Sequence, residues 1–374
     1  MRRTLEQFDW WLALSVLPLI FFGLVTMKSF GTEASGDYFF WRQLMWVGMG
    51  IVVFIIACRI DWHVYESNTP VLLGIYGVSI ALLGILLIVG SVVRGSQSWL
   101  QLPLFSLQPA ELAKLSLILV LAKYFARRHV EIALSRHLIV SAVYLGVPLA
   151  LVLGQPDVGT AMVLVAIWGG MVLFSGITLR QLVVLSVIGV TVVLTAWFFF
   201  FTAEQQSRII SFLAPASDPR GAGYHSIQAT VAVGSGEMWG KGVGYGTQSR
   251  LRFLPESQND FIYAAFVEEW GVAGAAVVFA LFGVIFWRLF RIARRAEGNF
   301  AQLFVIGLMM FLASHIVIHI GMNTGMLPIT GLSLPFMSYG GSLMLVLAAG
   351  IGIAQSIAIH SSFLGQRHSI QGLD

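Results

Sequence analysis

The sequence has little charge and almost no cysteine. Only 11% of its 374 residues are charged, against about 25% in typical soluble chains, so an ordinary soluble protein is excluded. Its single cysteine, Cys58, lies within an apolar run and can form neither an intramolecular disulfide nor a thiolate metal cluster. The net charge of +4 comes from scattered residues, so no basic face predicts nucleic-acid binding.

Hydrophobic residues make up 57% of the chain and gather in runs that can cross a bilayer, which takes about 20 apolar residues. We predict an all-α polytopic membrane protein with about ten transmembrane helices, forming a single integral membrane domain over residues 1–374. The first run is long enough to be an uncleaved span. The runs lie at about 10–27, 44–58, 70–93, 107–125, 138–154, 160–176, 182–201, 262–287, 300–320 and 341–360.

The distribution of Lys and Arg predicts which side of the membrane each connection faces. Cytoplasmic connections are enriched in these residues, and most basic residues in short connections share one side if the amino terminus is inside. We therefore expect both termini to be cytoplasmic. The long segment 203–259, between spans seven and eight, is then extracytoplasmic.

Two regions on the outer side are the best candidates for chemistry, because long loops are often functional. Segment 203–259 has eight glycines within 221–246, which allow sharp turns or close approach of the backbone to a ligand. A merely flexible loop is the open alternative. The second region, 321–342, is uncharged and broken by prolines, which predicts a re-entrant outer loop.

Three acidic positions are candidates for a site. Glu111 lies three residues before Lys114 within a span, so the two can pair, either as a structural ion pair or at the substrate. Asp260 lies where the long outer segment meets the eighth span and could be a general base or a helix N-cap. Asp157, in a short outer turn, could be a cap or part of the same site.

Several basic residues of the outer segment could bind a diphosphate, although a solvated loop surface is equally compatible with any one of them. They are Arg208, Arg220, Lys241, Arg250 and Arg252. His315 and His319 have the i, i+4 spacing of a zinc pair, but no third ligand is evident, so a metal site there is not expected. A divalent cation, Mg²⁺ or Mn²⁺, could act at the substrate, and the sequence fixes no ligands for it.

Four stretches together resemble the SEDS family (shape, elongation, division and sporulation), in its RodA-like elongation branch. They are SLQPAELAKL, GQPDVGTA, LPITGLSLPFMSYGGS and DPRGAGYHSIQATVAVGSGEMWGKGVGYGTQSRLRFLPESQNDFIYAAFVEEWG. The resemblance implies a peptidoglycan glycosyltransferase that polymerises lipid II onto a glycan carried by polyprenyl diphosphate, at the outer face of the bacterial cytoplasmic membrane. It also implies a class B penicillin-binding protein as transpeptidase partner, among other elongation-complex membrane proteins.

The resemblance also assigns roles to particular residues. The essential acid of the LPE-x-x-x-D-F motif falls on Asp260, which favours catalysis over capping there. The Glu-Lys pair of the QPAELAK span falls on Glu111 and Lys114, and the QPDxGTA aspartate on Asp157. The GTQS run, 246–249, favours the elongation branch over the FtsW-like division branch.

The chain departs from the family pattern at positions near the predicted base. Gln258 and Asn259 stand where His-Thr is usual, His319 stands where Asn is expected, and an arginine-rich run is reduced to Arg208. Two other functions remain open. One is a lipid II transporter (flippase) that uses buried charges for translocation, and the other is a non-catalytic scaffold for the transpeptidase.

Overall fold

The computed structural model describes residues 7–30, 34–90, 98–101, 106–127, 135–199, 201–215, 221–251, 253–254 and 256–371. Ten long helices within these ranges coincide with the ten predicted apolar runs. They are α2 (Trp10–Ser29), α3 (Ala34–Arg59), α5 (Thr69–Val89), α6 (Pro109–Ala126), α7 (Ser135–Gly154), α8 (Val158–Phe174), α9 (Leu179–Phe199), α13 (Ile262–Arg295), α14 (Asn299–Asn323) and α15 (Gly341–Gln371).

Eight of these helices are long and apolar enough to cross a membrane by length and composition. Of the other two, α8 has 17 residues, and α6 carries three charged residues within its 18. The predicted all-α polytopic membrane class is therefore confirmed. Several boundaries differ from the prediction, because α3 begins about ten residues earlier and α13 continues to Arg295.

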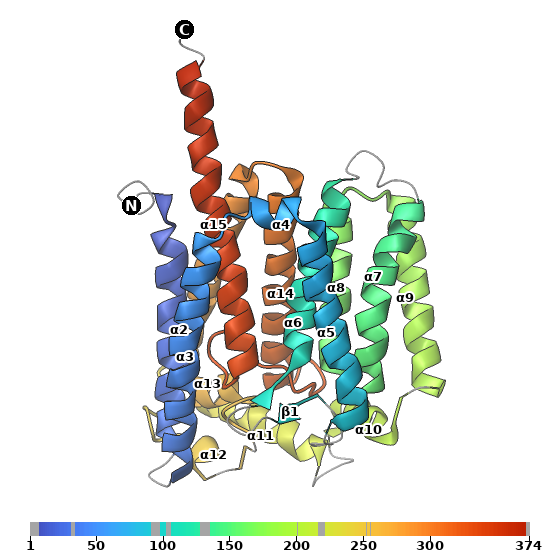
Figure 1. The fold of residues 1–374 in the computed structure, drawn as a ribbon. Helices are drawn as coiled ribbons and strands as arrows, with labels where there is room; N and C mark the ends of the chain where they lie inside the picture. Colours follow the sequence, from blue (N-terminus) through green and yellow to red (C-terminus); the bar gives the residue numbers. More distant parts are fainter. Residues whose placement is uncertain are drawn as a thin grey trace.

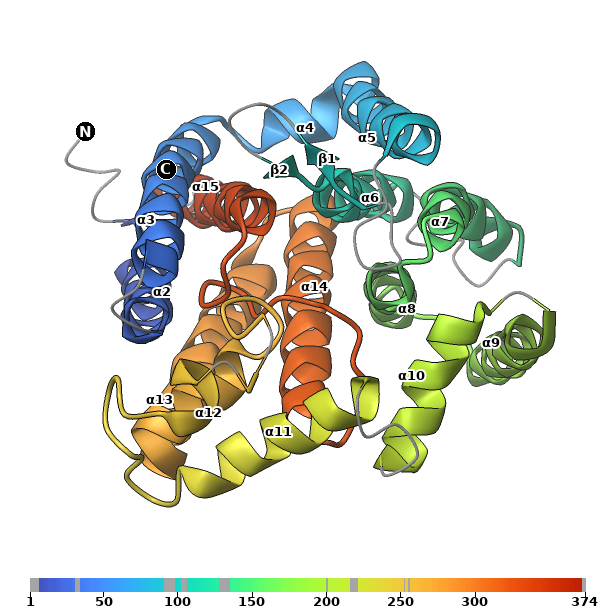
Figure 2. The same ribbon diagram turned by 90° about the horizontal axis from the view of Figure 1, so that it is seen from below.

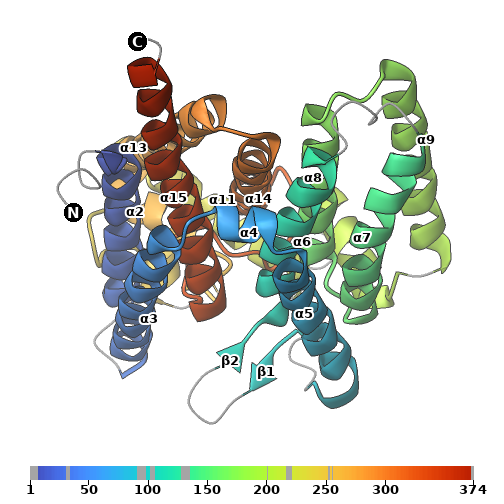
Figure 3. The ribbon, with the colours of Figure 1, turned by 45° about the horizontal axis from the view of Figure 1, so that its top comes forward.

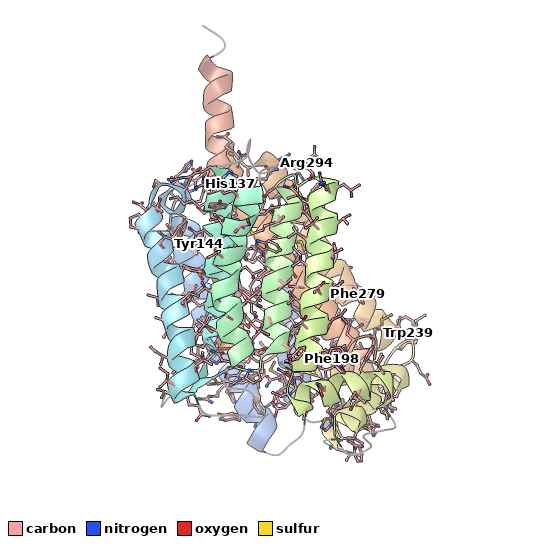
Figure 4. The ribbon with its side chains drawn as sticks, turned by 90° about the vertical axis from the view of Figure 1, so that its right-hand side faces the viewer. His137, Tyr144, Phe198, Trp239, Phe279 and Arg294 are labelled. Atoms are coloured by element: carbon pink, nitrogen blue, oxygen red, sulfur yellow. The ribbon has the colours of Figure 1, made fainter. Side chains whose placement is uncertain are left out.

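The helices stand side by side, and the connections gather at two opposite faces (Figure 1). The upper face of Figure 1 carries the start of α2, the end of α15 and the short helix α4 (His63–Ser67), and Arg294 marks it in Figure 4. The lower face, marked by Trp239 in Figure 4, carries α10 (Ala203–Leu213), α11 (Ala222–Ser235), α12 (Thr247–Arg250) and the hairpin β1 (Leu100–Gln101)–β2 (Ser106–Leu107). Much of the predicted loop 203–259 is thus helical.

Helices α6 and α14 form the buried centre of the bundle, and Figure 2 shows α14 in the middle of the lower face. Small residues allow the two helices to pack closely. A Cβ atom added at Gly307 of α14 would lie only 2.7 Å from Ile118 of α6. By contrast, α9 has no buried residue along 179–199 and lies at the edge of the bundle (Figure 2).

Helix α13 is interrupted at Gly271, whose φ of 67° and ψ of −168° suit only glycine. The loop before α12 fills the break and satisfies the backbone groups that the interruption frees. The four hydrogen bonds are Lys241 N–Glu268 O (2.9 Å), Gly242 N–Glu269 O (3.0 Å), Val272 N–Glu237 O (2.9 Å) and Ala273 N–Met238 O (3.0 Å). The glycine-rich stretch therefore allows close packing of the backbone against the break in α13.

Candidate active site

Asp260 lies in the turn that leads into α13 at the lower face, and it is half-buried. Its backbone is fixed by Asn323 at the end of α14, whose Nδ2 donates to the Asp260 carbonyl at 2.9 Å. The Oδ1 atom of Asn323 accepts from Ala264 N at 3.1 Å. The N-cap position of α13 is Phe261, the residue after Asp260. Asp260 therefore lies one residue before the position at which a cap was expected.

The non-helical segment 324–340 follows α14 and reaches the side chain of Asp260. A Cβ atom added at Gly331 would lie 3.8 Å from Asp260 Oδ2, so this part of the segment lies beside the carboxylate. Gly331 has a φ of 75°, a conformation that favours glycine. This position brings the two predicted outer regions together around one acidic side chain.

Gln258 and Asn259, the two departures before Asp260, help to anchor the same segment. Their backbone carbonyls accept from Tyr339 N at 2.9 Å and from Ser338 Oγ at 2.8 Å, respectively. Their side-chain amides both donate to Glu256 Oε2, at 3.3 and 3.0 Å. Both amides therefore organise the turn itself through Glu256.

The predicted pair of Glu111 and Lys114 forms, with Nζ–Oε1 at 2.8 Å, and both side chains are buried. Lys114 Nζ also lies 3.0 Å from His315 Nε2 on α14. Since an ammonium only donates hydrogen bonds, this imidazole nitrogen must accept, and the ring proton is on Nδ1. His315 Nδ1 accordingly donates to the carbonyl of Ser333 at 2.9 Å.

His319 makes the neighbouring contact one helical turn further along α14. Its Nδ1 lies 2.7 Å from the carbonyl of Leu332 and must donate, because a carbonyl only accepts. The two histidines thus hold consecutive carbonyls next to Gly331, the residue that faces Asp260. The two histidines have the i, i+4 spacing of a zinc motif, and here this spacing lets both rings bind segment 324–340.

Two buried acceptor atoms in the group formed by Glu111, Lys114 and the two histidines have no hydrogen-bond partner among the described residues. One is Glu111 Oε2, and the other is His319 Nε2. Buried acceptors are rarely left unpaired, because losing water without a replacement donor costs free energy. A donor that is not part of the described chain would complete the hydrogen bonding of this region.

Asp157 is the N-cap of α8, and both of its carboxylate oxygens accept hydrogen bonds. Oδ1 accepts from Thr160 N at 2.9 Å, while Oδ2 accepts from Thr160 Oγ1 at 2.8 Å and Ser98 Oγ at 3.3 Å. The capped end lies beside segment 324–340, since a Cβ atom added at Gly159 would be 2.8 Å from the Thr330 carbonyl. Asp157 therefore has the capping role, and a role in substrate binding stays a prediction.

The predicted cationic residues of the outer segment have different surroundings. Lys241 Nζ is bound by buried Glu268 at 2.8 Å and by Thr247 Oγ1 at 3.0 Å, so its ammonium already has a counter-ion. Arg250 is exposed at the end of α12, and Arg208 is half-buried on α10. Arg220 and Arg252 lie outside the described residues.

Glu268 is a buried organising residue that the sequence did not reveal. Besides Lys241 and Thr247, it accepts from the backbone amides of Gln248 at 3.0 Å and Ser249 at 3.3 Å. Glu268 comes after the glycine-rich stretch in the sequence, and no local spacing of residues predicted this contact. For metals, no group of three or more His, Cys, Asp or Glu side chains in the described ranges could hold an ion, so the divalent cation stays a prediction.

These features define a polytopic helical membrane protein with an acidic turn at one face and a buried ion pair linked to it through a loop. A family model described as "Cell cycle protein", that of FtsW, RodA and SpoVE, matches residues 6–363. The chain belongs to this family, which confirms the SEDS resemblance.

Individual relatives agree with this assignment. The chain is 40% identical over 332 residues to "Peptidoglycan glycosyltransferase MrdB" of Escherichia coli K12, covering 87% of each chain. It is 34% identical to "Stage V sporulation protein E" of Bacillus subtilis 168, covering 95% of this chain and 98% of that protein.

Solved structures have the same fold. A chain of a peptidoglycan synthase complex superimposes with a TM-score of 0.80 at 27% identity, covering 95% of this chain and 98% of that one. RodA of Thermus thermophilus, at 24% identity, matches with a TM-score of 0.68 over 94% of this chain and 96% of that one, which supports the fold alone.

Proposed function

We propose that this protein is an elongation-type peptidoglycan glycosyltransferase that polymerises lipid II into β-1,4 glycan strands. The observation that carries the proposal is the approach of segment 324–340 to the Asp260 carboxylate at the lower face. The name of the E. coli relative supports the same activity. The lower face is then the outer face of the bacterial cytoplasmic membrane.

In the proposed reaction, the glycan on polyprenyl diphosphate is the donor and the 4-hydroxyl of lipid II is the acceptor. Conversion of an α-linked sugar diphosphate into a β-linked glycan is an inversion, which needs one in-line displacement and one base. Asp260 takes the hydroxyl proton as the oxygen attacks the anomeric carbon, and the diphosphate leaves with the bonding electrons. Since diphosphate is a good leaving group, no general acid is required.

The charge of the departing diphosphate needs stabilisation at the same face. Exposed Arg250 is a better candidate than Lys241 and Lys114, because each of these lysines already has a glutamate partner. Arg208 on α10 stays a candidate, because a guanidinium offers two parallel hydrogen bonds to phosphate oxygens. Mg²⁺ or Mn²⁺ would add Lewis-acid stabilisation if bound with the substrate. A class B penicillin-binding protein, as transpeptidase partner, is supported by the match to a chain of a complex that coordinates polymerization and crosslinking.

Purified protein, given labelled lipid II and no other polymerase, tests the proposal. Wild type should make glycan strands, and Asp260→Asn should lower the rate by about 10²–10⁴-fold with an unchanged melting temperature, because the amide cannot accept the proton. Glu237→Gln, which changes an exposed acid on the same face, is the matched control. Polymerisation by Asp260→Asn at the wild-type rate would remove the assigned base.

The transporter alternative rests on buried Glu111 and Lys114 within a spanning helix. Vesicles that contain the purified protein and labelled lipid II distinguish the two functions. A transporter moves lipid II between leaflets without lengthening its sugar chain. Transfer between leaflets without strand synthesis, unaffected by Asp260→Asn, would replace the proposed function.

A further inference from the structure

A polar cavity of about 380 Å³ opens at the upper face, across the membrane domain from Asp260. It lies where α4, the end of α6 and the start of α14 meet, and Figure 3 shows these elements next to one another. Its lining residues are Glu66, Lys123, Ala126, Arg127, Asn299 and Phe300. The proposed polymerase reaction uses none of them.

Lys123 is the unusual member of this lining. Lys123 is only 6% exposed, and its Nζ has no hydrogen-bond partner among the described residues. A buried ammonium is costly unless an acceptor or a counter-ion replaces the water that it loses. Lys123 therefore favours an anionic ligand in the cavity that it lines.

The start of α14 adds a second source of positive potential. The helix begins at Asn299, after Gly298, and the described residues place no side-chain cap on its first turn. Free backbone N–H groups at a helix N-terminus, together with the helix dipole, favour a phosphate oxygen. Arg127, which follows α6, supplies a second side-chain cation to the same cavity.

Glu66 limits how much negative charge the cavity can accept. A Cβ atom added at Gly298 would lie 3.9 Å from Glu66 Oε1, so this carboxylate lies close to the start of α14. Two cations and one anion leave a formal charge of +1, which matches a singly charged phosphate diester better than free phosphate dianion. Lys123 is in the last turn of α6, and the end of a helix in a membrane bundle lies near the level of the phospholipid headgroups.

We propose that this cavity binds the phosphate group of a phospholipid headgroup in the leaflet at the upper face. Lys123 and Arg127 donate charge-assisted hydrogen bonds to the phosphate, and the first-turn amides of α14 donate to its remaining oxygens. Such a lipid would bridge the ends of α6 and α14, the two central helices whose opposite ends build the candidate active site.

Native mass spectrometry of the full chain, released from nanodiscs of phosphatidylglycerol and phosphatidylcholine, tests the proposal. Wild type should retain phosphatidylglycerol, and Lys123→Gln should weaken this retention by about tenfold, the loss expected for one charge-assisted hydrogen bond. Lys123→Arg should retain the lipid. Arg295→Gln, which removes an exposed cation from the same face, should behave as wild type.

A second measurement separates the lipid from a soluble source of phosphate. Inorganic phosphate is titrated against the melting temperature of the detergent-solubilised protein. Stabilisation of wild type but not of Lys123→Gln, without lipid retention, would keep the phosphate site and assign it to a soluble ligand. If Lys123→Gln does not fold, Arg127→Gln takes its place in both measurements. Equal lipid retention and equal phosphate response in wild type and variant would overturn the proposal.

Discussion

Two glutamate–lysine pairs in this molecule, each with a buried glutamate, have the same Nζ–Oε1 distance and very different surroundings. Both Nζ–Oε1 distances are 2.8 Å, in the pairs Glu268–Lys241 and Glu111–Lys114. The Glu268 carboxylate accepts hydrogen bonds from four residues, and both of its oxygens are partnered. Glu111 accepts from Lys114, while its Oε2 atom is buried without a partner among the described residues.

The Glu268 carboxylate stabilises the fold through hydrogen bonds to both of its oxygens, whereas the described protein provides a hydrogen bond to only one oxygen of Glu111. Burial of a carboxylate is tolerated when donors replace the lost water, and the loop around α12 supplies such donors to Glu268. Around Glu111 the described protein supplies one, while Lys114 is shared with His315. We therefore expect changes at Glu268 to lower stability, and changes in the Glu111 network to lower activity in a protein that still folds.

The largest effect should come from Glu268→Gln. The substitution turns an amide N–H₂ toward groups that are themselves donors, among them the backbone amides of Gln248 and Ser249. Leaving such buried donors without an acceptor should cost about 3 kcal/mol of unfolding free energy. Thermal unfolding in detergent measures this loss. Polymerisation per folded molecule should stay within about twofold of wild type, and a selective loss of polymerisation at an unchanged melting temperature would break the comparison.

His315→Leu should have the next largest effect. Leucine removes both the acceptor for Lys114 and the donor to the Ser333 carbonyl, and an unpaired buried group costs about 1–3 kcal/mol. If the loop positions the acceptor sugar near Asp260, kcat should fall by about tenfold or more while KM changes little. His315→Gln keeps a donor and an acceptor, so it should restore part of kcat. No rescue by glutamine, with KM rising instead, would argue against positioning.

The positions of these groups show how far the sequence could be read. The apolar runs predicted the ten helices, since length and hydropathy alone decide what can cross a membrane, and i, i+3 spacing predicted the Glu111–Lys114 pair. Contacts across the bundle were not predictable. The approach of Glu268 to the loop around α12, and of His315 to Lys114, depends on tertiary packing that no local spacing encodes.

Glu111→Gln should have a smaller effect and sharpen the comparison directly. Lys114 loses one charged partner but keeps His315 and the nearby Phe311 ring, with Nζ 5.5 Å from its centroid. We expect the unfolding free energy to fall by less than in Glu268→Gln, and strand synthesis to fall by about tenfold, or about 1.4 kcal/mol. Melting temperatures and polymerisation rates of both variants are measured side by side. A larger loss of stability than in Glu268→Gln would show that the Glu111–Lys114 pair, like the Glu268–Lys241 pair, mainly stabilises the fold.

Substitutions of Asp157 should give the smallest effect. Like Glu268, Asp157 has hydrogen bonds to both carboxylate oxygens, but it lies close to the candidate active site. Asp157→Ser keeps an oxygen that can accept from Thr160 N but removes the charge, whereas Asp157→Ala removes the cap and should cost about 1 kcal/mol. If capping is the whole role, the serine variant polymerises lipid II at nearly the wild-type rate and the alanine variant is only less stable. If the serine variant instead loses activity at an unchanged melting temperature, the carboxylate contacts substrate. A carboxylate with hydrogen bonds to both of its oxygens could then not be assigned a purely structural role in this protein.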